Sequence, residues 1–153
     1  MNKIFLFFFL NLLLFGCGYK VVDKSNLRNF YITEITNTGD NRINFKIKNK
    51  LLFNNPENKQ KPLSLTIDSN KKKNIYEKND KNEITKYKID VEIKVKYVEV
   101  VNKNNGNFVI NASKILDVKD QQSSTLNRER KLVDLMCDDL ADKILDKIYL
   151  RTK

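Results

Sequence analysis

The stretch ITKYKIDVEIKVKY, residues 84–97, decides the fold class because from Tyr87 onward it alternates strictly between apolar and charged residues. From Tyr87 to Tyr97 the apolar side chains fall at odd positions and the charged side chains fall at even positions. Since successive side chains of a strand point to opposite faces, this pattern predicts a long strand with one face on a core and one face in polar surroundings. The alternation shifts at Val98 and Val100, so we expect a β-bulge after Tyr97.

Two further strands flank this stretch in sequence. Residues 102–106 (NKNNG) form a hairpin connection, and apolar residues then alternate in a strand from residue 108 to about residue 118. Upstream, residues 63–67 begin another strand, which we expect to be interrupted or bulged within 71–75, a segment that starts with three lysines. Residues 78–82 have the composition of a turn.

The N-terminal part of the domain predicts a strand followed by a helix. Residues 30–35 alternate in a β-rich composition, and residues 37–40 (NTGD) form a turn cluster whose Asp40 is suited to cap a helix. Residues 41–54 fit a strand, through alternating apolar residues, and also one face of a helix, through apolar residues four apart. The Asp40 cap and the LLF ending favour the helix, and Pro56 ends it.

The C-terminal segment predicts a helix over residues 125–150. A turn of 100° per residue brings one apolar stripe together: Leu126, Val133, Met136, Cys137, Leu140, Ala141, Ile144 and Ile148. The opposite side carries Leu135, Leu145 and Tyr149, either as isolated exposed residues or as a second contact surface. Cys137 lies on the apolar face, where a free cysteine behaves as a small hydrophobe. The element order is therefore β-α-β-β-β-α.

The N-terminus, MNKIFLFFFLNLLLFGC, indicates export. Its apolar run, residues 4–15, is much shorter than the roughly 20 residues of a membrane-spanning helix and is typical of a signal peptide. Cys17 directly after Gly16 resembles the lipobox of bacterial lipoproteins, although Phe15 departs from that pattern. The resemblance implies cleavage after Gly16, a diacylglyceryl group and a fatty acyl chain such as palmitate on Cys17. The alternative is an ordinary signal peptide, or an uncleaved anchor, with an incidental Cys17. Gly18, rather than Asp, implies sorting to the outer membrane.

The composition argues for a binding or structural protein rather than an enzyme. The chain has no histidine, and its four glycines form no phosphate-binding loop. Asp138, Asp139 and Asp142 alternate with lysines on one helix, which is typical of a solvated face rather than a metal site. We therefore expect no metal and no cofactor besides the covalent lipid. The net charge of +10 fits either codon bias toward lysine and asparagine or an anionic partner. For an exported protein that partner would be a phosphorylated glycolipid, not a nucleic acid.

Four segments in this order resemble the LptE family of lipopolysaccharide-assembly outer-membrane lipoproteins. They are CGY at 17–19, ITNTGDNRINFKIKNKLL at 35–52, the alternating strand at 84–97, and GNFVINAS at 106–113 followed by a helix with LADKIL at 140–145. The resemblance covers nearly all of the mature chain, and its specificity comes from order and spacing. The chain departs from the family in its few arginines and its lysine-rich 69–82 segment.

The resemblance implies an α+β fold: a two-layer sandwich in which two helices pack on a four-stranded mixed sheet. It divides the chain into a cleaved signal peptide (1–16), a lipidated tether (17–29) and a single domain (30–153). It also implies a function: the domain plugs an LptD-like outer-membrane β-barrel in a 1:1 complex, assists its assembly and helps insert lipopolysaccharide into the outer leaflet. The protein would then lie on the periplasmic side of the outer membrane and inside the barrel lumen. The alternative is another non-catalytic periplasmic lipoprotein, either an envelope assembly factor or an inhibitor of a lytic enzyme.

The candidate lipopolysaccharide-binding residues are Lys86, Lys88, Lys94 and Lys96. Even-numbered positions of this strand project together away from the core, so their ammonium groups could meet the phosphates of the glycolipid. The alternative is a merely solvated row of lysines.

Overall fold

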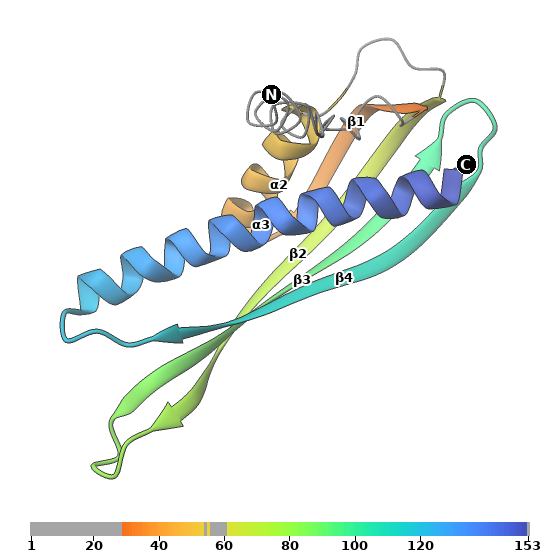
Figure 1. Ribbon diagram of the computed structural model, residues 1–153. Coiled ribbons are helices and arrows are strands. Elements are labelled where there is room, and N and C mark those ends of the chain that lie inside the picture. The colour runs from red at the N-terminus through yellow and green to blue at the C-terminus, as the bar shows by residue number, and fades with distance from the viewer. Residues whose placement is uncertain (1–28, 54, 56–60, 153) are drawn as a thin grey trace, which may run out of the picture.

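The computed structural model describes residues 29–53, 55 and 61–152, which fold into two layers (Figure 1). The elements are β1 (Phe30–Gly39), α2 (Asn41–Phe53), β2 (Lys61–Lys78), β3 (Ile84–Glu99), β4 (Asn105–Asp117) and α3 (Gln122–Thr152). Both helices lie on one face of the sheet. The predicted order β-α-β-β-β-α and the α+β class are confirmed. The expected signal peptide, the lipid site Cys17 and nearly all of the expected tether lie outside the described residues.

The sheet has the order β1-β2-β3-β4, so neighbours in the sheet are also neighbours in the chain. β1 pairs with β2 in parallel, across the helix α2, whereas the β2–β3 and β3–β4 pairs are antiparallel. The sheet is therefore mixed, as expected. The hairpin of β2 and β3 extends beyond the region that the helices cover (Figure 1).

The transition from β1 to α2 explains why residues 41–53 are helical. The Oδ1 atom of Asp40 accepts hydrogen bonds from the backbone N–H groups of Arg42 and Ile43, at 3.0 and 3.1 Å. This is an N-cap, and it satisfies donors that the first helical turn leaves unpaired. Ile43 and Ile47 are buried, whereas Phe45 is 63% exposed, so the helical spacing and not the alternation is the one realised.

The turn predicted within residues 37–39 is wrong, because these residues complete β1. Asn37, Thr38 and Gly39 pair with Ile67, Asp68 and Ser69 of β2. Gly39 has φ = +90°, and a Cβ built on it would lie 2.0 Å from the carbonyl oxygen of Ser69. The glycine therefore permits both the left-handed backbone and the close approach of the two strands.

The two predicted strand irregularities also require correction. Lys71, Lys72 and Lys73 pair regularly with β3, and the register shift lies further on, between Ile75 and Lys78. After Tyr97 no bulge occurs: Val98 pairs with both Ser64 and Asn105. Glu99 continues the inward-facing phase and is only 4% exposed, because its carboxylate accepts a 3.0 Å hydrogen bond from Asn102 and so satisfies its polarity locally.

The core lies between the helices and the inward face of the sheet. All odd residues of β3 from Ile89 to Val95 are 0% exposed, and Leu140 of α3 is 0% exposed as well. Two residues of α3 were assigned to the wrong side. Leu145 is buried, because α3 packs against both α2 and the sheet and so buries a wider arc than one stripe. Leu126 is 43% exposed, in the first turns of the helix.

Candidate functional site

The four candidate lysines lie on the outer face of the sheet, away from both helices. Paired residues of an antiparallel ladder share a face, so the outer face comprises even residues of β3 and the residues opposite them. Lys94 thus lies between Asp68 and Val109, and Lys96 lies between Thr66 and Asn107. The sequence interpretation that these lysines project together, opposite the core, agrees with this geometry.

Carboxylates of the same face accompany three of the four lysines. Lys86 Nζ lies 2.7 Å from the carboxylate of Glu77, and this hydrogen bond raises the pKa of Lys86. Lys88 Nζ lies 3.5 Å from Asp90, and Lys94 Nζ lies 3.8 Å from Asp68. The outer face is therefore a pattern of alternating charge rather than a uniformly positive surface.

Lys96 differs from the other three candidates. Within the part of the chain that the structure describes, no carboxylate lies within ion-pair distance of its ammonium group. Its neighbours in the ladder are Thr66 and Asn107, both uncharged. Lys96 is therefore the candidate whose charge is most available to an external anion.

A shallow hollow of about 400 Å³ lies in the middle of the outer face. Charged and amide side chains of three strands line it, among them Lys72, Lys88, Glu92 and Asn111. Asp90 lies in this hollow and accepts a hydrogen bond from the Ser113 hydroxyl, which lowers the pKa of the carboxyl. The hollow is thus polar, and its Asp90 carboxylate already accepts hydrogen bonds from within the sheet.

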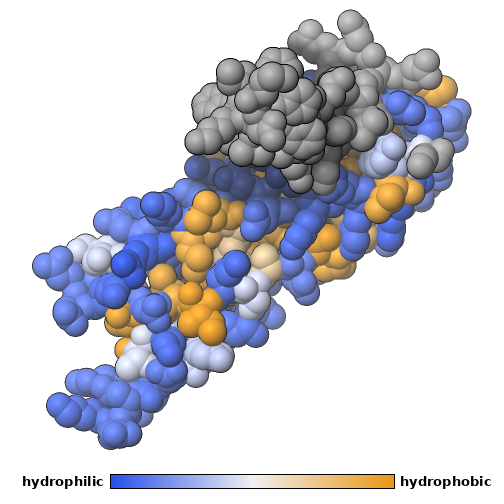
Figure 2. Space-filling model, viewed as in Figure 1, coloured by the Kyte–Doolittle hydropathy of each residue, from blue (hydrophilic) through white to orange (hydrophobic). Residues whose placement is uncertain are grey.

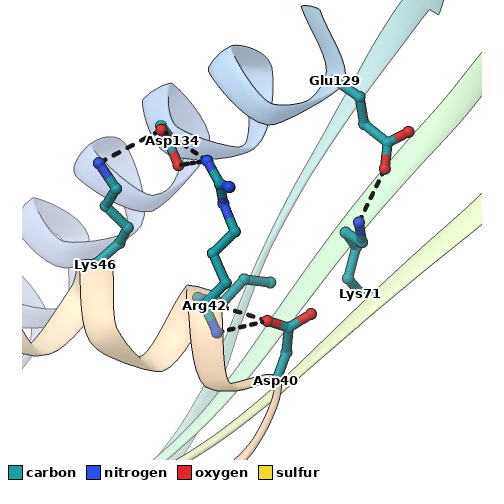
Figure 3. Close-up of polar contacts among 7 residues, drawn as sticks. Asp40, Arg42, Lys46, Lys71, Glu129 and Asp134 are labelled. Atoms are coloured by element: carbon teal, nitrogen blue, oxygen red, sulfur yellow. Dashed lines mark hydrogen bonds and ion pairs between the residues drawn. The ribbon is translucent and has the colours of Figure 1, made fainter. Parts of the chain in front are cut away.

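A second cluster, which the sequence interpretation missed, joins the helices to the sheet. Lys71 and Lys73 of β2 each place Nζ 2.8 Å from one carboxylate oxygen of Glu129 in α3. Asp134, one turn further along α3, binds Arg42 of α2 at 3.0 Å (Figure 3). A signal for the first contact was present in the sequence, because Glu129 stands four residues before Val133 on the buried stripe. A carboxylate there needs a cation.

Opposing effects act on the ionisation of Glu129. Its side chain is only 10% exposed, and this desolvation, the largest single influence, would raise the pKa. The hydrogen bonds and charges of Lys71 and Lys73 together outweigh the desolvation, so the pKa of Glu129 lies below its usual value of 4.5. The Nζ of Lys73 also lies 4.1 Å from the centre of the Tyr87 ring. The cluster is a structural ion-pair network that closes the core near the start of α3.

Cys137 is buried in the core and chemically quiet. It is 1% exposed, as expected for a small hydrophobe on the apolar stripe. Burial, with the nearby Asp134, Asp138 and Asp40, raises its pKa to about 12, so the thiol stays protonated. A reactive role for this residue is therefore not favoured.

The described residues offer neither a metal site nor a membrane span. No group of three or more potential ligands among His, Cys, Asp and Glu is arranged to hold a metal ion in the described ranges. Neither α2 nor α3 combines the length and apolar character that crossing a bilayer requires.

Comparisons with known proteins show the fold. No protein-family model matches the sequence, and no curated protein matches it. Rare lipoprotein B from Shewanella oneidensis is similar in structure, with a TM-score of 0.57 and 13% identity over 76% of this chain and 93% of that chain. Lipoprotein B from Nitrosomonas europaea has a TM-score of 0.60 and 15% identity, over 80% and 84%. A Caulobacter crescentus lipoprotein has a TM-score of 0.59 and 12% identity, over 84% and 93%. Two helices on a four-stranded sheet are therefore a recurrent architecture among these proteins.

Proposed function

We propose that this protein is an outer-membrane lipoprotein of the LptE type, which plugs an LptD-like β-barrel in a 1:1 complex. In this role it assists assembly of the barrel and insertion of lipopolysaccharide into the outer leaflet. It performs no bond-making step and requires no cofactor beyond the lipid on Cys17. It is held on the periplasmic side of the outer membrane and reaches into the barrel lumen.

One combination of observations carries the proposal. The Gly16–Cys17 lipobox follows a short apolar run, and the domain behind it has the fold of rare lipoprotein B, a bacterial lipoprotein. The four segments that resemble this family include β3, which forms an inner strand of the sheet, and the capped helix α2. The lipobox and the architecture are independent of each other, since one is a sequence motif and the other a backbone shape.

The outer face of the sheet supports the plug. The lumen of an outer-membrane barrel is polar, so a plug has to present a polar surface to it. Here the ion pairs of Lys86 with Glu77 and Lys94 with Asp68 neutralise charges on this face in advance. Such a face can approach a polar wall without leaving isolated charges between the two surfaces.

The same face carries the proposed contact with lipopolysaccharide. Lys96 offers an ammonium group without a nearby carboxylate among the described residues, and Lys94 is held only at 3.8 and 3.9 Å from its two carboxylates. Lys86 and Lys88 would have to exchange Glu77 and Asp90 for a phosphate. We therefore place Lys94 and Lys96 first among the four candidates. An ammonium–phosphate contact is strong only where water is partly excluded, as inside a barrel.

Affinity purification from native outer membranes tests the partner. The tagged wild-type chain should recover a stoichiometric β-barrel protein, and mass spectrometry should find an acylated N-terminal Cys17. The Cys17→Ala variant serves as the control and should no longer fractionate with the outer membrane. If another envelope protein were recovered and no barrel, the proposal would be rejected in favour of the alternative, a different non-catalytic lipoprotein.

Reversing the charges of Lys94 and Lys96 tests whether these residues bind lipopolysaccharide. Lys94→Glu with Lys96→Glu should weaken lipopolysaccharide binding and make it less sensitive to salt, while the barrel complex persists. The matched control reverses Lys131 and Lys143, two exposed lysines of α3 on the other side of the molecule. If both double variants bind lipopolysaccharide as the wild type does, the outer-face lysines are not the site.

A further inference from the structure

One end of the domain gathers exposed apolar side chains from three segments. At this end β1 and β2 begin, β3 stops and β4 starts. The ends of both helices join it: Asn55, just after α2, exchanges two hydrogen bonds with the backbone of Ile32, and the backbone carbonyl of Thr152 accepts a 2.6 Å hydrogen bond from Lys61 Nζ. Figure 1 shows the end of α2, the β3–β4 loop and the end of α3 there.

The apolar residues of this end form what we term the apolar tip. Its members are more than 40% exposed: Leu52 and Phe53 of α2, Val98 at the end of β3, Val100 and Val101 of the β3–β4 connection, and Leu150 of α3. Phe53, Val101 and Leu150 are the most open, at 87%, 68% and 71%. Hydrophobic residues also reach the surface at this end in Figure 2. A gathering of this kind marks an interaction surface, whereas isolated exposed apolar residues need no explanation.

The opposite end of the molecule provides the contrast. The tip of the β2–β3 hairpin, residues 77–83, is polar throughout and fully hydrophilic in Figure 2. Its backbone turn is held by hydrogen bonds from Asn79 to Glu83 and from Asn82 to Asn79. The two ends therefore differ in character, and the apolar one is the end suited to a partner.

The position at which the chain enters the domain identifies that partner. Asn29, the first described residue, lies at the apolar end, where its carbonyl oxygen accepts a hydrogen bond from the backbone N–H of Lys61. Only residues 18–28 separate it from Cys17, which spans at most about 40 Å even when fully extended. Lys50, Lys103 and Arg151 stand within two residues of tip members in the chain and add positive charge at this end. An apolar tip within a basic surround suits a bilayer surface with anionic headgroups.

We propose that the apolar tip rests in the interfacial region of the membrane leaflet that holds the lipid anchor. This inference rests on the lipidation in the proposed function but not on the barrel. The anchor brings the tip to the membrane, and the tip fixes the orientation of the domain relative to it.

Tryptophan reporters test the contact, because the chain contains no tryptophan. Two matched pairs are used in the lipidated protein: Val101→Trp against Val109→Trp, and Phe53→Trp against Phe45→Trp. Val109 and Phe45 are exposed at 49% and 63% but lie away from the tip, on β4 and two turns earlier in α2. Vesicles of phosphatidylethanolamine and phosphatidylglycerol, with and without brominated acyl chains, provide the membrane.

The expected result is a blue shift and bromine quenching for the tip reporters, with an unshifted and unquenched signal from their controls. Equal quenching within each pair, or vesicle-bound protein without quenching at Val101→Trp and Phe53→Trp, would overturn the inference and leave the anchor intact. If the protein did not float with the vesicles at all, both the lipid anchor and this inference would be rejected.

Discussion

The β2–β3 ladder has two halves that follow one register but are covered in different ways. In the half near the start of β2, the inward pairs Leu65–Tyr97 and Ile67–Val95 are apolar and buried. In the other half β3 still contributes Ile89 and Val91, both 0% exposed, but β2 places Lys73 and Lys71 opposite them. The inward face of a sheet can therefore be covered by the aliphatic parts of lysine side chains, provided that a helix supplies a carboxylate to pair with their ammonium groups.

The largest loss of stability should come from a substitution in the half of the β2–β3 ladder whose inward pairs are apolar. Ile93→Ala removes a side chain that is 0% exposed in an inner strand, so we expect a loss of about 2–5 kcal/mol in the free energy of unfolding. Leu140→Ala, on the facing helix, should fall in the same range. Urea denaturation followed by circular dichroism measures both. A loss below that of an exposed substitution would mean that the two faces of β3 are assigned the wrong way round.

A substitution at the boundary between the two halves, where Gly39 pairs with Ser69, should destabilise the fold almost as much. Gly39 pairs with Ser69 where β1 ends, and Gly39→Ala combines an unfavourable φ with a collision between Cβ and the Ser69 carbonyl. We expect a loss of about 3 kcal/mol, at the upper end of the cost of backbone strain. The same denaturation experiment checks this. Gly106→Ala is not a neutral control, because its Cβ would lie 2.6 Å from the Tyr97 hydroxyl oxygen and 2.7 Å from the ring.

In the other half of the ladder, where Lys71 and Lys73 pair with Glu129, stability should depend on both substitution and pH. Glu129→Gln leaves two ammonium groups without their carboxylate and should cost about 1–3 kcal/mol at pH 7. Since the folded pKa of Glu129 lies below its ordinary value of 4.5, the contribution is fully present above that pH and is lost as pH falls through the folded pKa.

Denaturation at a series of pH values separates this contribution. The wild type should lose stability between about pH 4.5 and the lower folded pKa more steeply than Glu129→Gln does. Parallel curves for the two proteins would show that the cluster adds no pH-dependent stability. Lys71→Met with Lys73→Met and Glu129→Met replaces the whole cluster and should recover part of the loss.

The smallest effect should come from the outer face. Lys94→Ala removes an ammonium group 3.8 Å from Asp68 on a solvent-exposed surface, so stability should change by less than about 0.5 kcal/mol. Thermal denaturation is sufficiently sensitive to detect a larger effect. If this variant proved more damaging than Ile93→Ala, the outer face would have a structural role that its exposure does not indicate.

Much of the fold was predictable because periodicity records which face of an element is buried. Strict alternation located β3, and the Asp40 cap resolved the helix α2 from a competing strand. Composition misled at Asn37–Gly39, where turn-forming residues extend β1 because β2 offers them a pairing partner. Leu145 was misplaced because α3 contacts two surfaces, and a single sequence does not specify how wide the buried arc will be.

The candidate site was predictable only in part. The direction of Lys86, Lys88, Lys94 and Lys96 followed from alternation, which also put Asp90 and Glu92 on their face, but the carboxylate partners on β2 did not follow from it. Asp68 and Glu77 belong to β2, and only the register of β2 against β3 brings them beside Lys94 and Lys86. In a hairpin the register depends on the exact turn and on any bulge beside it, and the sequence pattern did not locate the register shift between Ile75 and Lys78. The lipid site Cys17 rests on its sequence motif alone, since it lies outside the described residues.

Because the strands lie in the sheet in the order in which they occur in the chain, the domain has a natural order of folding. The β2–β3 and β3–β4 ladders close short loops, whereas β1 can dock only after β2 has formed. The inward face of the sheet is fully covered only when α3, the final element, packs on it. The core therefore closes late, and we expect folding to be completed only after the whole domain has been synthesised, as a post-translational rather than a co-translational event.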